Sequence, residues 1–322
     1  MNALVTNIPP AKPPITVQLA SPRGFCAGVE RAIRTVEEAL ARHGAPVYVR
    51  HEIVHNSHVV ARLSAMGAVF VDSCDDAPAD RPLVFSAHGA PMSAHQKAAA
   101  RGLVKIDATC PLVLKVHGQT RRHVAAGRRV ILIGHDNHPE VIGTMGQAAP
   151  GTVELVEAIE DALSLPLDPR PLAYVTQTTL SVDETRDIIA ALKSRFPDAI
   201  GPAREDICYA TSNRQQSVKA SAKGTGLFVV IGSPTSSNSL RLVETAKAAG
   251  AANALLAEDA ESFDWSLTDN IETIGLSAGA SAPESLVEDF LTALAMRRTV
   301  TIKTVETARE NVVFNTPQRL AS

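Results

Sequence analysis

Short strand-like runs alternate with helix-like stretches along almost the whole chain, and this alternation limits the fold more than any other feature. Runs of β-branched and other apolar residues predict buried strands. They are ITVQLA (15–20), VYVR (47–50), AVFVD (68–72), PLVFS (82–86), LVKID (103–107), VILIG (130–134), VELVE (153–157), LAYVT (172–176), LFVVIG (227–232), ALLAED (254–259) and ETIGLS (272–277). Amphipathic stretches between many of these runs predict helices, so the pattern is typical of an α/β protein with largely parallel sheets.

Capping signals mark two of the predicted helices. Ser181 and Ser281 each stand three residues before a glutamate, which is the pattern of a capping box at a helix start. The stretch after residue 298 lacks a helical period and is expected to be irregular, with some strand potential.

Length, charge and aromatic content exclude several classes of protein. The 322 residues suffice for two or three domains. A net charge of −3 and 4% aromatic residues argue against a nucleic-acid binder, which needs basic and stacking surfaces. No apolar run is long enough to span a membrane, and the N-terminus lacks the features of a signal peptide. We therefore expect a cytoplasmic protein.

Three of the four cysteines share one context. Cys26, Cys110 and Cys208 each separate a strand-like run from a helix-like stretch, whereas Cys74 lies in a polar loop. Their spacing suggests three small α/β units, each supplying one cysteine. We predict a flexible tail over 1–14 and domains over 15–109, 110–207 and 208–282, with the segment 283–322 packing back on the first domain.

A cysteine at a helix N-terminus is suited to binding a soft metal. The helix end favours the thiolate and should lower the thiol pKa. Three isolated cysteines from three units could share an iron–sulfur cubane with one iron left free, or a zinc ion with one water. Their spacing is compatible with both sites. A structural core role is the alternative for any single cysteine.

Histidines, small hydroxyl groups and one acid follow the predicted strands. Loops after strand ends converge on the ligand site of open α/β folds, and this set of groups suits a phosphate-type anion. For each histidine a core or surface role is the alternative, and Ser181 is best explained as a helix cap. Glu140 could relay a proton beside a bound anion or simply begin a helix. The segments carrying these groups are His51–Asn56, Ser86–Gly89, His135–Glu140, Gln177–Thr179, Ser236–Asn238 and Ser281.

Several long motifs occur in a fixed order between about residues 16 and 315. They are PRGFCAGVERAI, VRHEIVHN, FSAHG, DATCPLVLKVH, GHDNHPEVIGTMGQ, TQTTLSVDET, DICYATSNRQ, SSNSLRL and AGASAPE. In these motifs the chain resembles the LytB-type 4-hydroxy-3-methylbut-2-enyl diphosphate reductases. The chain departs from the family pattern in a longer N-terminal segment and in Pro234-Thr235 before the paired serines.

The resemblance implies a trefoil of three α/β domains around a central iron–sulfur cluster. It also implies two-electron removal of an allylic hydroxyl group, giving isopentenyl and dimethylallyl diphosphate in the last step of the non-mevalonate (MEP) pathway of isoprene biosynthesis. The implied cofactor is one [4Fe-4S] cluster with one open iron, and the implied electron donor is a ferredoxin or flavodoxin. The implied site residues are Cys26, Cys110 and Cys208 on the cluster, His55, His88, His138, Ser236, Ser237, Asn238 and Ser281 on the diphosphate, Glu140 as proton source and Thr178 near the substrate hydroxyl.

Two other functions share part of this pattern. A hydro-lyase or quinolinate-synthase-like enzyme would use a three-cysteine cluster without net reduction of its substrate. An iron–sulfur carrier or redox sensor would have no need for the histidine, serine and glutamate groups.

Overall fold

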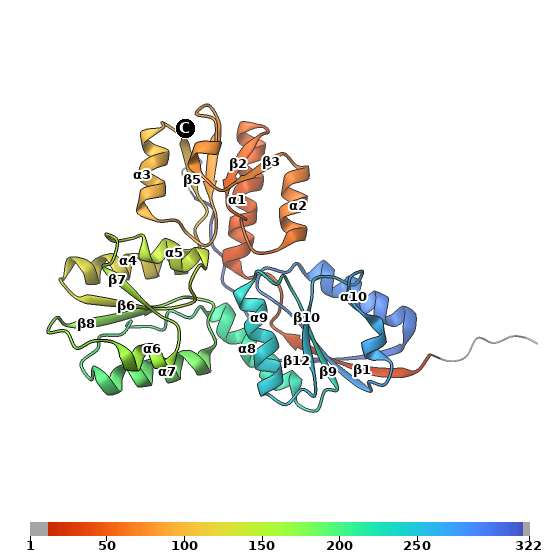
Figure 1. Cartoon of the computed structure of the whole chain (residues 1–322). Helices are drawn as coiled ribbons and strands as arrows, with labels where there is room; N and C mark the ends of the chain where they lie inside the picture. Colours follow the sequence, from red (N-terminus) through yellow and green to blue (C-terminus); the bar gives the residue numbers. More distant parts are fainter. Residues whose placement is uncertain (1–11, 318–322) are drawn as a thin grey trace, which may run out of the picture.

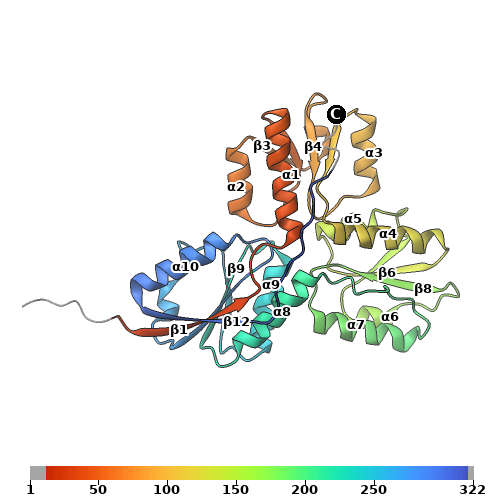
Figure 2. The same cartoon turned by 180° about the vertical axis from the view of Figure 1, so that it is seen from behind.

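The computed structural model describes residues 12–317, which form three lobes around a common centre (Figures 1 and 2). Each lobe holds one parallel β-sheet with helices packed against it. The expected trefoil of α/β units with parallel sheets is therefore confirmed. No helix in this range is long and apolar enough to cross a membrane. The predicted tail over 1–14 lies largely outside the described residues, and Pro14 already begins a strand.

The first lobe has a four-stranded sheet in the order β3-β2-β4-β5. Its strands are β2 (Val47–Arg50), β3 (Ala68–Val71), β4 (Pro82–Phe85) and β5 (Val104–Asp107). Its helices are α1 (Ala27–His43), α2 (Ser57–Ala65) and α3 (Met92–Ala100), with a 3-10 turn η1 (Cys74–Asp76). The end of α1 follows from local chemistry, because Gly44 adopts φ +70°, a conformation that side chains disfavour.

The second lobe has a three-stranded sheet in the order β7-β6-β8. Its strands are β6 (Arg129–Ile133), β7 (Val153–Val156) and β8 (Leu172–Thr176). Its helices are α4 (Pro111–Ala125), α5 (Pro139–Met145), α6 (Ile159–Ser164) and α7 (Val182–Arg195). Every residue of β6 and β8 is buried, as expected for parallel strands covered on both faces.

The third lobe has a five-stranded sheet in the order β10-β9-β11-β1-β12. Its strands are β1 (Pro14–Ser21), β9 (Leu227–Ile231), β10 (Ala254–Ala257), β11 (Thr273–Ala278) and β12 (Thr299–Glu306). Its helices are α8 (Tyr209–Ala222), α9 (Ser237–Ala248) and α10 (Glu284–Arg297), with a 3-10 turn η2 (Trp265–Thr268).

Both ends of the chain differ from the expected domain boundaries. Strand β1 was expected in the first domain, but it pairs with β11 and β12 in the third lobe, where Ile15, Val17 and Leu19 enter the core. The segment 283–322 was expected on the first domain, but α10 and β12 also belong to the third lobe. Only its end reaches the first lobe, where Arg34 donates to the carbonyl of Phe314. A buried apolar strand carries no local sign of which sheet it joins, so long-range packing decided both points.

The stretch after residue 298 also differs from the irregular structure expected there. Strand β12 is eight residues long and pairs with β1 along its whole length. Most of β12 is exposed at the edge of the sheet. Val300 and Ile302 alternate with polar residues, but the alternation does not continue through the second half of the strand, so the sequence showed only strand potential here.

Except for the loop before Cys208, the loops that carry the candidate site residues leave the carboxyl ends of strands. In a parallel sheet such loops all lie at the same end, where the strands terminate. In this molecule that end of each of the three sheets faces the molecular centre (Figure 1). The fold therefore gathers segments that are far apart in the sequence.

Candidate active site

A pocket at the centre of the molecule is lined by residues from all three lobes. All twelve residues that sequence analysis assigned to the site line this pocket, and they do so together with several small and apolar neighbours. The lining comprises Cys26, Gly28, Val29, Val54, His55, Ala87, His88, Cys110, Val113, His138, Glu140, Thr178, Thr179, Cys208, Thr211, Ser236, Ser237, Asn238, Ala280 and Ser281.

Each of the three cysteines is the N-cap residue of a helix. Cys26 precedes α1, Cys110 precedes α4 and Cys208 precedes α8. Gly28 shows how closely two of them approach, because a Cβ atom there would lie 2.7 Å from the sulfur of Cys110 and 3.8 Å from that of Cys26. The lack of a side chain at Gly28 leaves room for the two sulfur atoms.

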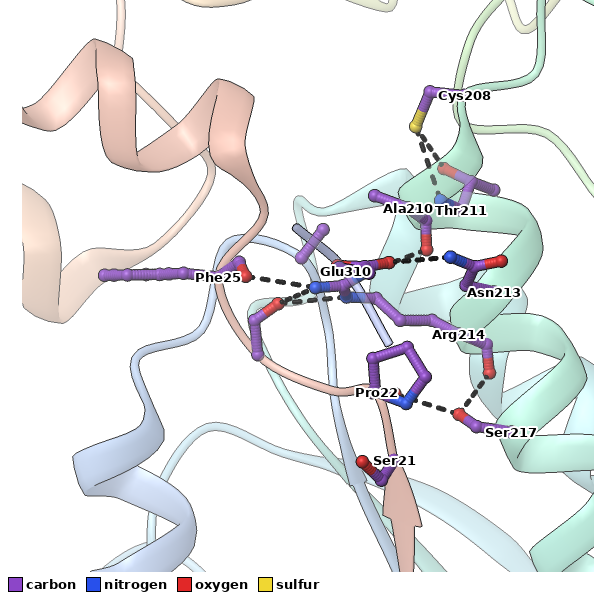
Figure 3. A network of polar contacts seen from close by, with 12 residues as sticks. Ser21, Pro22, Phe25, Cys208, Ala210, Thr211, Asn213, Arg214, Ser217 and Glu310 are labelled. Atoms are coloured by element: carbon purple, nitrogen blue, oxygen red, sulfur yellow. Dashed lines mark hydrogen bonds and ion pairs between the residues drawn. The ribbon is translucent and has the colours of Figure 1, made fainter. Parts of the chain in front are cut away.

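Cys208 reaches the pocket by a different local route. It follows the loop 197–207 rather than a strand, which corrects the expected strand–cysteine–helix order at this position. Its backbone N–H donates to the carbonyl of Thr178 at 3.0 Å. Its sulfur accepts from the backbone N–H of Thr211 at 3.3 Å and lies 3.1 Å from the hydroxyl of Thr211 (Figure 3).

The thiol pKa values run opposite to the expected direction. Burial raises the pKa of Cys110 to about 12 and that of Cys208 to about 11, and the neighbouring Cys26 adds to both shifts. The helix ends are too weak to offset this desolvation. Buried thiols of this kind ionise when a cation binds them, so the donor set fits a soft metal centre. Within residues 12–317 no three His, Cys, Asp or Glu side chains form a group that could hold a single metal ion.

Three imidazole rings lie together on the wall of the pocket. The rings of His55 and His88 stack with centroids 4.1 Å apart, and His138 meets them edge-on at 5.7 and 6.0 Å. Burial lowers the pKa of His138 to about 3 and that of His88 well below its usual value, and the adjacent imidazoles act in the same direction. His88 and His138 are therefore neutral near pH 7.

The hydrogen bonds of these rings show which ring nitrogen of His138 carries the proton and which nitrogens of His55 and His88 have no partner within residues 12–317. Nδ1 of His138 accepts from the backbone N–H of Glu140 at 3.1 Å, so Nε2 carries the proton. Nε2 of His55 and Nδ1 of His88 are buried and have no hydrogen-bond partner among the described residues. Buried groups of this kind usually have partners, so these two nitrogens fit a ligand in the pocket.

The N-terminus of α9 supplies hydroxyl and amide groups. Ser236 is the N-cap and accepts from the backbone N–H of Ser239, and Ser237 and Asn238 form the first turn. A helix N-terminus of this length presents free N–H groups and a positive dipole end to an anion. This side of the pocket therefore has the groups that would suit an anion.

Ser281 does not cap a helix, which corrects the second capping box. The N-cap of α10 is Pro283, without a side-chain cap bond. The hydroxyl of Ser281 instead donates to the carbonyl of His55 at 2.9 Å and lies 3.4 Å from the hydroxyl of Ser236. Ser181, by contrast, caps α7 as expected, accepting from the backbone N–H of Glu184.

Glu140 and Thr178 form a buried pair. One carboxyl oxygen of Glu140 accepts from the backbone N–H of Thr178 at 2.7 Å, and the other accepts from its hydroxyl at 2.9 Å. Burial raises the pKa of Glu140 to about 7, against the lowering effect of these two bonds. A carboxyl group with this pKa can release a proton near neutral pH.

Thr211 lines the pocket but was not predicted there, whereas Thr179 lies in the polar segment Gln177–Thr179 that was expected near the ligand but was given no role of its own. The hydroxyl of Thr211 contacts Cys208 and accepts from the side-chain amide of Asn238 at 3.4 Å, while the hydroxyl of Thr179 donates to that of Ser237 at 3.2 Å. The one local signal for Thr211 is its position three residues after the cysteine, on the same side of the helix.

A family model described as "LytB protein" matches residues 17–295. This chain belongs to the LytB family. A LytB-family protein from Hyphomonas neptunium, named 4-hydroxy-3-methylbut-2-enyl diphosphate reductase, is 58% identical over 311 residues, covering 96% of this chain and 99% of the relative. A protein of the same name from Phenylobacterium zucineum is 57% identical, covering 97% of this chain and 99% of the relative. The resemblance drawn from the motifs is confirmed.

Two solved LytB-family structures are similar to this chain. The E-1-hydroxy-2-methyl-but-2-enyl-4-diphosphate reductase of Plasmodium falciparum is 38% identical, with a TM-score of 0.92 over 95% of this chain and 96% of that chain. A second structure, described as (E)-4-hydroxy-3-methyl-but-2-enyl diphosphate reductase and as the terminal enzyme of the non-mevalonate pathway, is 31% identical with a TM-score of 0.63. It covers 88% of this chain and 99% of that chain.

Proposed function

We propose that this protein reduces (E)-4-hydroxy-3-methylbut-2-enyl diphosphate to isopentenyl and dimethylallyl diphosphate, the last step of the non-mevalonate pathway. Two electrons and two protons enter, the allylic C–O bond breaks, and water leaves. The observation that carries this proposal is the meeting of three thiols, an anion-binding wall and a buried acid in one pocket. The names of the relatives support the same activity.

We assign Cys26, Cys110 and Cys208 to a [4Fe-4S] cluster with one iron free of protein ligands. When bound, this cluster would supply electrons and a Lewis-acidic site for the substrate hydroxyl. The space beside Gly28 and the meeting of three sulfur donors in one pocket support the assignment.

The diphosphate is assigned to the histidine and α9 side of the pocket. The Nε2–H of neutral His138 can donate to a phosphate oxygen, and the open nitrogens of His55 and His88 are available to the same group. Ser236, Ser237, Asn238 and Ser281 add short polar groups at the helix end. His88 and His138 are neutral donors. Nδ1 of His55 lies 3.0 Å from the carboxylate of Glu52, so His55 donates to the anion through Nε2 only when both of its ring nitrogens carry protons. Binding energy from the diphosphate can then position the reacting carbon.

Glu140 is assigned as the proton donor to the leaving hydroxyl group. With a pKa of about 7, it is substantially protonated at neutral pH and can convert hydroxide, a poor leaving group, into water. Thr178 fixes both carboxyl oxygens and so orients the acid toward the pocket.

The electron donor is proposed to be a small ferredoxin or flavodoxin, and the protein is proposed to act in the cytoplasm. A hydro-lyase and an electron carrier remain the competing functions. The protonated acid beside an anion wall favours net reductive loss of a hydroxyl group over electron transfer alone.

One assay separates the three functions. Anaerobically reconstituted protein, a strong chemical reductant and the hydroxylated diphosphate should yield both isopentenyl and dimethylallyl diphosphate, with two electrons consumed per substrate. A product formed without electron consumption would identify a hydro-lyase. Reduction of the protein without any substrate conversion would identify a carrier.

A further inference from the structure

Three basic side chains link the helices that begin at the cysteines, and none of the three lines the pocket. They are Arg31, Lys115 and Arg214, which stand five, five and six residues after Cys26, Cys110 and Cys208. Each donates hydrogen bonds to backbone carbonyls of the segment that leads into another cysteine. We call these three side chains the clamp residues.

Arg214 on α8 holds the segment before Cys26. Its guanidinium group donates to the carbonyl of Gly24 at 2.9 and 2.8 Å and to that of Phe25 at 3.0 Å (Figure 3). The side chain is 1% exposed. One turn further along α8, the hydroxyl of Ser217 donates to the carbonyl of Pro22 at 2.9 Å. Helix α8 therefore determines where the chain enters Cys26.

Arg31 on α1 holds the segment before Cys110. It donates to the carbonyl of Thr109 at 3.0 Å and lies 3.4 Å from that of Asp107. Arg31 is buried, and desolvation lowers its pKa. The side chain thus joins the helix of the first cysteine to the residue just before the second.

Lys115 on α4 holds the segment before Cys208. Its ammonium group donates to the carbonyls of Arg204 and Glu205, both at 2.9 Å, and lies 3.1 Å from the buried carboxylate of Asp206. The three links therefore run in one direction. Each clamp residue reaches the next cysteine segment along the chain, and the third returns to the first.

The C-terminal stretch runs along two of these clamps. Figure 2 shows it passing from β12 beside α8 toward the first lobe. Glu310 accepts from Arg214 at 2.9 and 3.1 Å and from the side-chain amide of Asn213 at 3.0 Å, and the carbonyl of Asn315 accepts from Arg31 at 2.8 Å. Glu310 supplies the negative charge that a buried guanidinium needs.

We propose that the clamp residues form a closed ring that sets the separation of Cys26, Cys110 and Cys208. They are positioning residues, because they act on the cysteines through the backbone and do not touch the pocket. Metal ligands must be held in place by their surroundings, and three ligands from three lobes have no shared element to do this. That the cysteines bind a cluster rests on the proposed function, whereas the ring itself stands on the contacts above.

The direction of the ring gives a specific test on the metal-free full-length chain. Hydrogen exchange followed by mass spectrometry should be compared for Arg31→Gln, Lys115→Gln and Arg214→Gln. Each variant should speed exchange most in the segment before the next cysteine, namely 107–110, 204–208 and 22–26 respectively. Uniform acceleration, or none in these segments, would overturn the ring.

Arg298→Gln is the matched control. Arg298 is also buried and donates to several backbone carbonyls, but its partners, including Pro14 and Ile271, all lie in the third lobe at the opposite end of β1. It should leave the three cysteine segments unchanged. A third of the Lys115 side chain is exposed, so Lys115→Gln should disturb folding less than the substitution of a buried arginine. If an arginine variant does not fold, Lys115→Gln still tests whether exchange speeds up in 204–208.

The second measurement uses the iron-loaded protein. The clamp variants and Glu310→Gln should lose iron to a chelator about ten- to a hundredfold faster than wild type, whereas Arg298→Gln should not. Equal rates in all variants would overturn the positioning role. If even wild type takes up no iron, the proposed function fails, and the exchange pattern then still decides whether the ring exists.

Discussion

Glu140 shows how one buried residue acquires its chemistry from its surroundings. The carboxyl group is almost fully buried, and desolvation raises its pKa to about 7 even though both oxygens accept hydrogen bonds from Thr178. The same bonds orient it, so Thr178 controls its direction and burial controls its acidity.

Glu140→Gln should lower kcat by about two to four orders of magnitude, the usual contribution of a general acid. Glutamine keeps the size of the side chain and an acceptor for the Thr178 N–H, so substrate affinity should change much less. In wild type, kcat should fall as the pH rises above about 7, because the acid form is lost. Steady-state kinetics across pH measure both effects. Near-normal turnover of Glu140→Gln would show that another group donates the proton.

The raised pKa of Glu140 also predicts how stability depends on pH. The folded protein holds this proton more tightly than the unfolded chain, so the contribution is present below the ordinary pKa of 4.5 and is lost as the pH rises through about 7. Relative to wild type, Glu140→Gln should gain about 3 kcal/mol of unfolding free energy between about pH 4 and about pH 8. Denaturant unfolding of the two metal-free proteins at several pH values tests this. If the free energies of unfolding of wild type and Glu140→Gln changed in parallel with pH, the assigned pKa would be wrong.

At the scale of elements, three helix N-termini each present one cysteine to the same pocket. The helix ends do not by themselves ionise Cys110 and Cys208, since burial has the larger effect on the pKa of both thiols. The elements instead provide placement, because each cysteine is the N-cap of its helix and all three line the pocket.

Cys26→Ala, Cys110→Ala and Cys208→Ala should each abolish the visible absorbance of the reconstituted protein and its activity. Cys74→Ala is the control, because Cys74 is buried in a separate core in the first lobe and lines no part of the pocket. Iron analysis and visible spectra provide the measurement. Bleaching caused by Cys74→Ala alone would show that the ligands are assigned wrongly.

Gly28→Ala should impair iron uptake, because the added Cβ would lie 2.7 Å from the sulfur of Cys110. Gly118→Ala in α4 is the control, since a Cβ there meets only the flexible end of Arg122, at 3.5 Å. The control should gain roughly 0.5–1 kcal/mol from helix propensity and load iron normally. Iron content and unfolding curves decide the matter, and normal loading of Gly28→Ala would contradict the close approach of the sulfurs.

At the scale of the whole molecule, the anion wall is assembled from all three lobes. His55 and His88 come from the first lobe, His138 from the second, and Asn238 and Ser281 from the third. The hydroxyl of Ser281 donates directly to the carbonyl of His55, so the first and third lobes meet at this wall. The groups proposed to bind the diphosphate therefore come from every lobe.

The free allylic alcohol should therefore lose turnover at saturation as well as affinity, because binding energy from the diphosphate places the reacting carbon. His88→Ala and Asn238→Ala should partly reproduce that loss with the diphosphate while leaving the visible spectrum of the free protein unchanged. Kinetics of both substrates on one anaerobic preparation give the comparison. If the free alcohol and the diphosphate had equal rates at saturation, these residues would stabilise the bound substrate and the transition state equally and would not position the reacting carbon.

The sequence by itself determined most of the local structure and identified most of the polar residues that line the pocket. Apolar runs identified the strands of all three sheets, with only strand potential for β12. The three cysteines could be recognised as N-caps from their position before a helical period. The family motifs selected twelve of the twenty residues that line the pocket. These signals are local, because periodicity and capping depend on neighbours in the chain.

Only the tertiary structure decided the partners and the environments. It placed β1 in the third sheet, turned Ser281 from a helix cap to the carbonyl of His55, and raised the thiol pKa values that helix ends alone would lower. It also joined Arg214 to the chain before Cys26, across 190 residues of sequence. Strand pairing, desolvation and such links depend on groups brought together only by packing, so no window of sequence contains them.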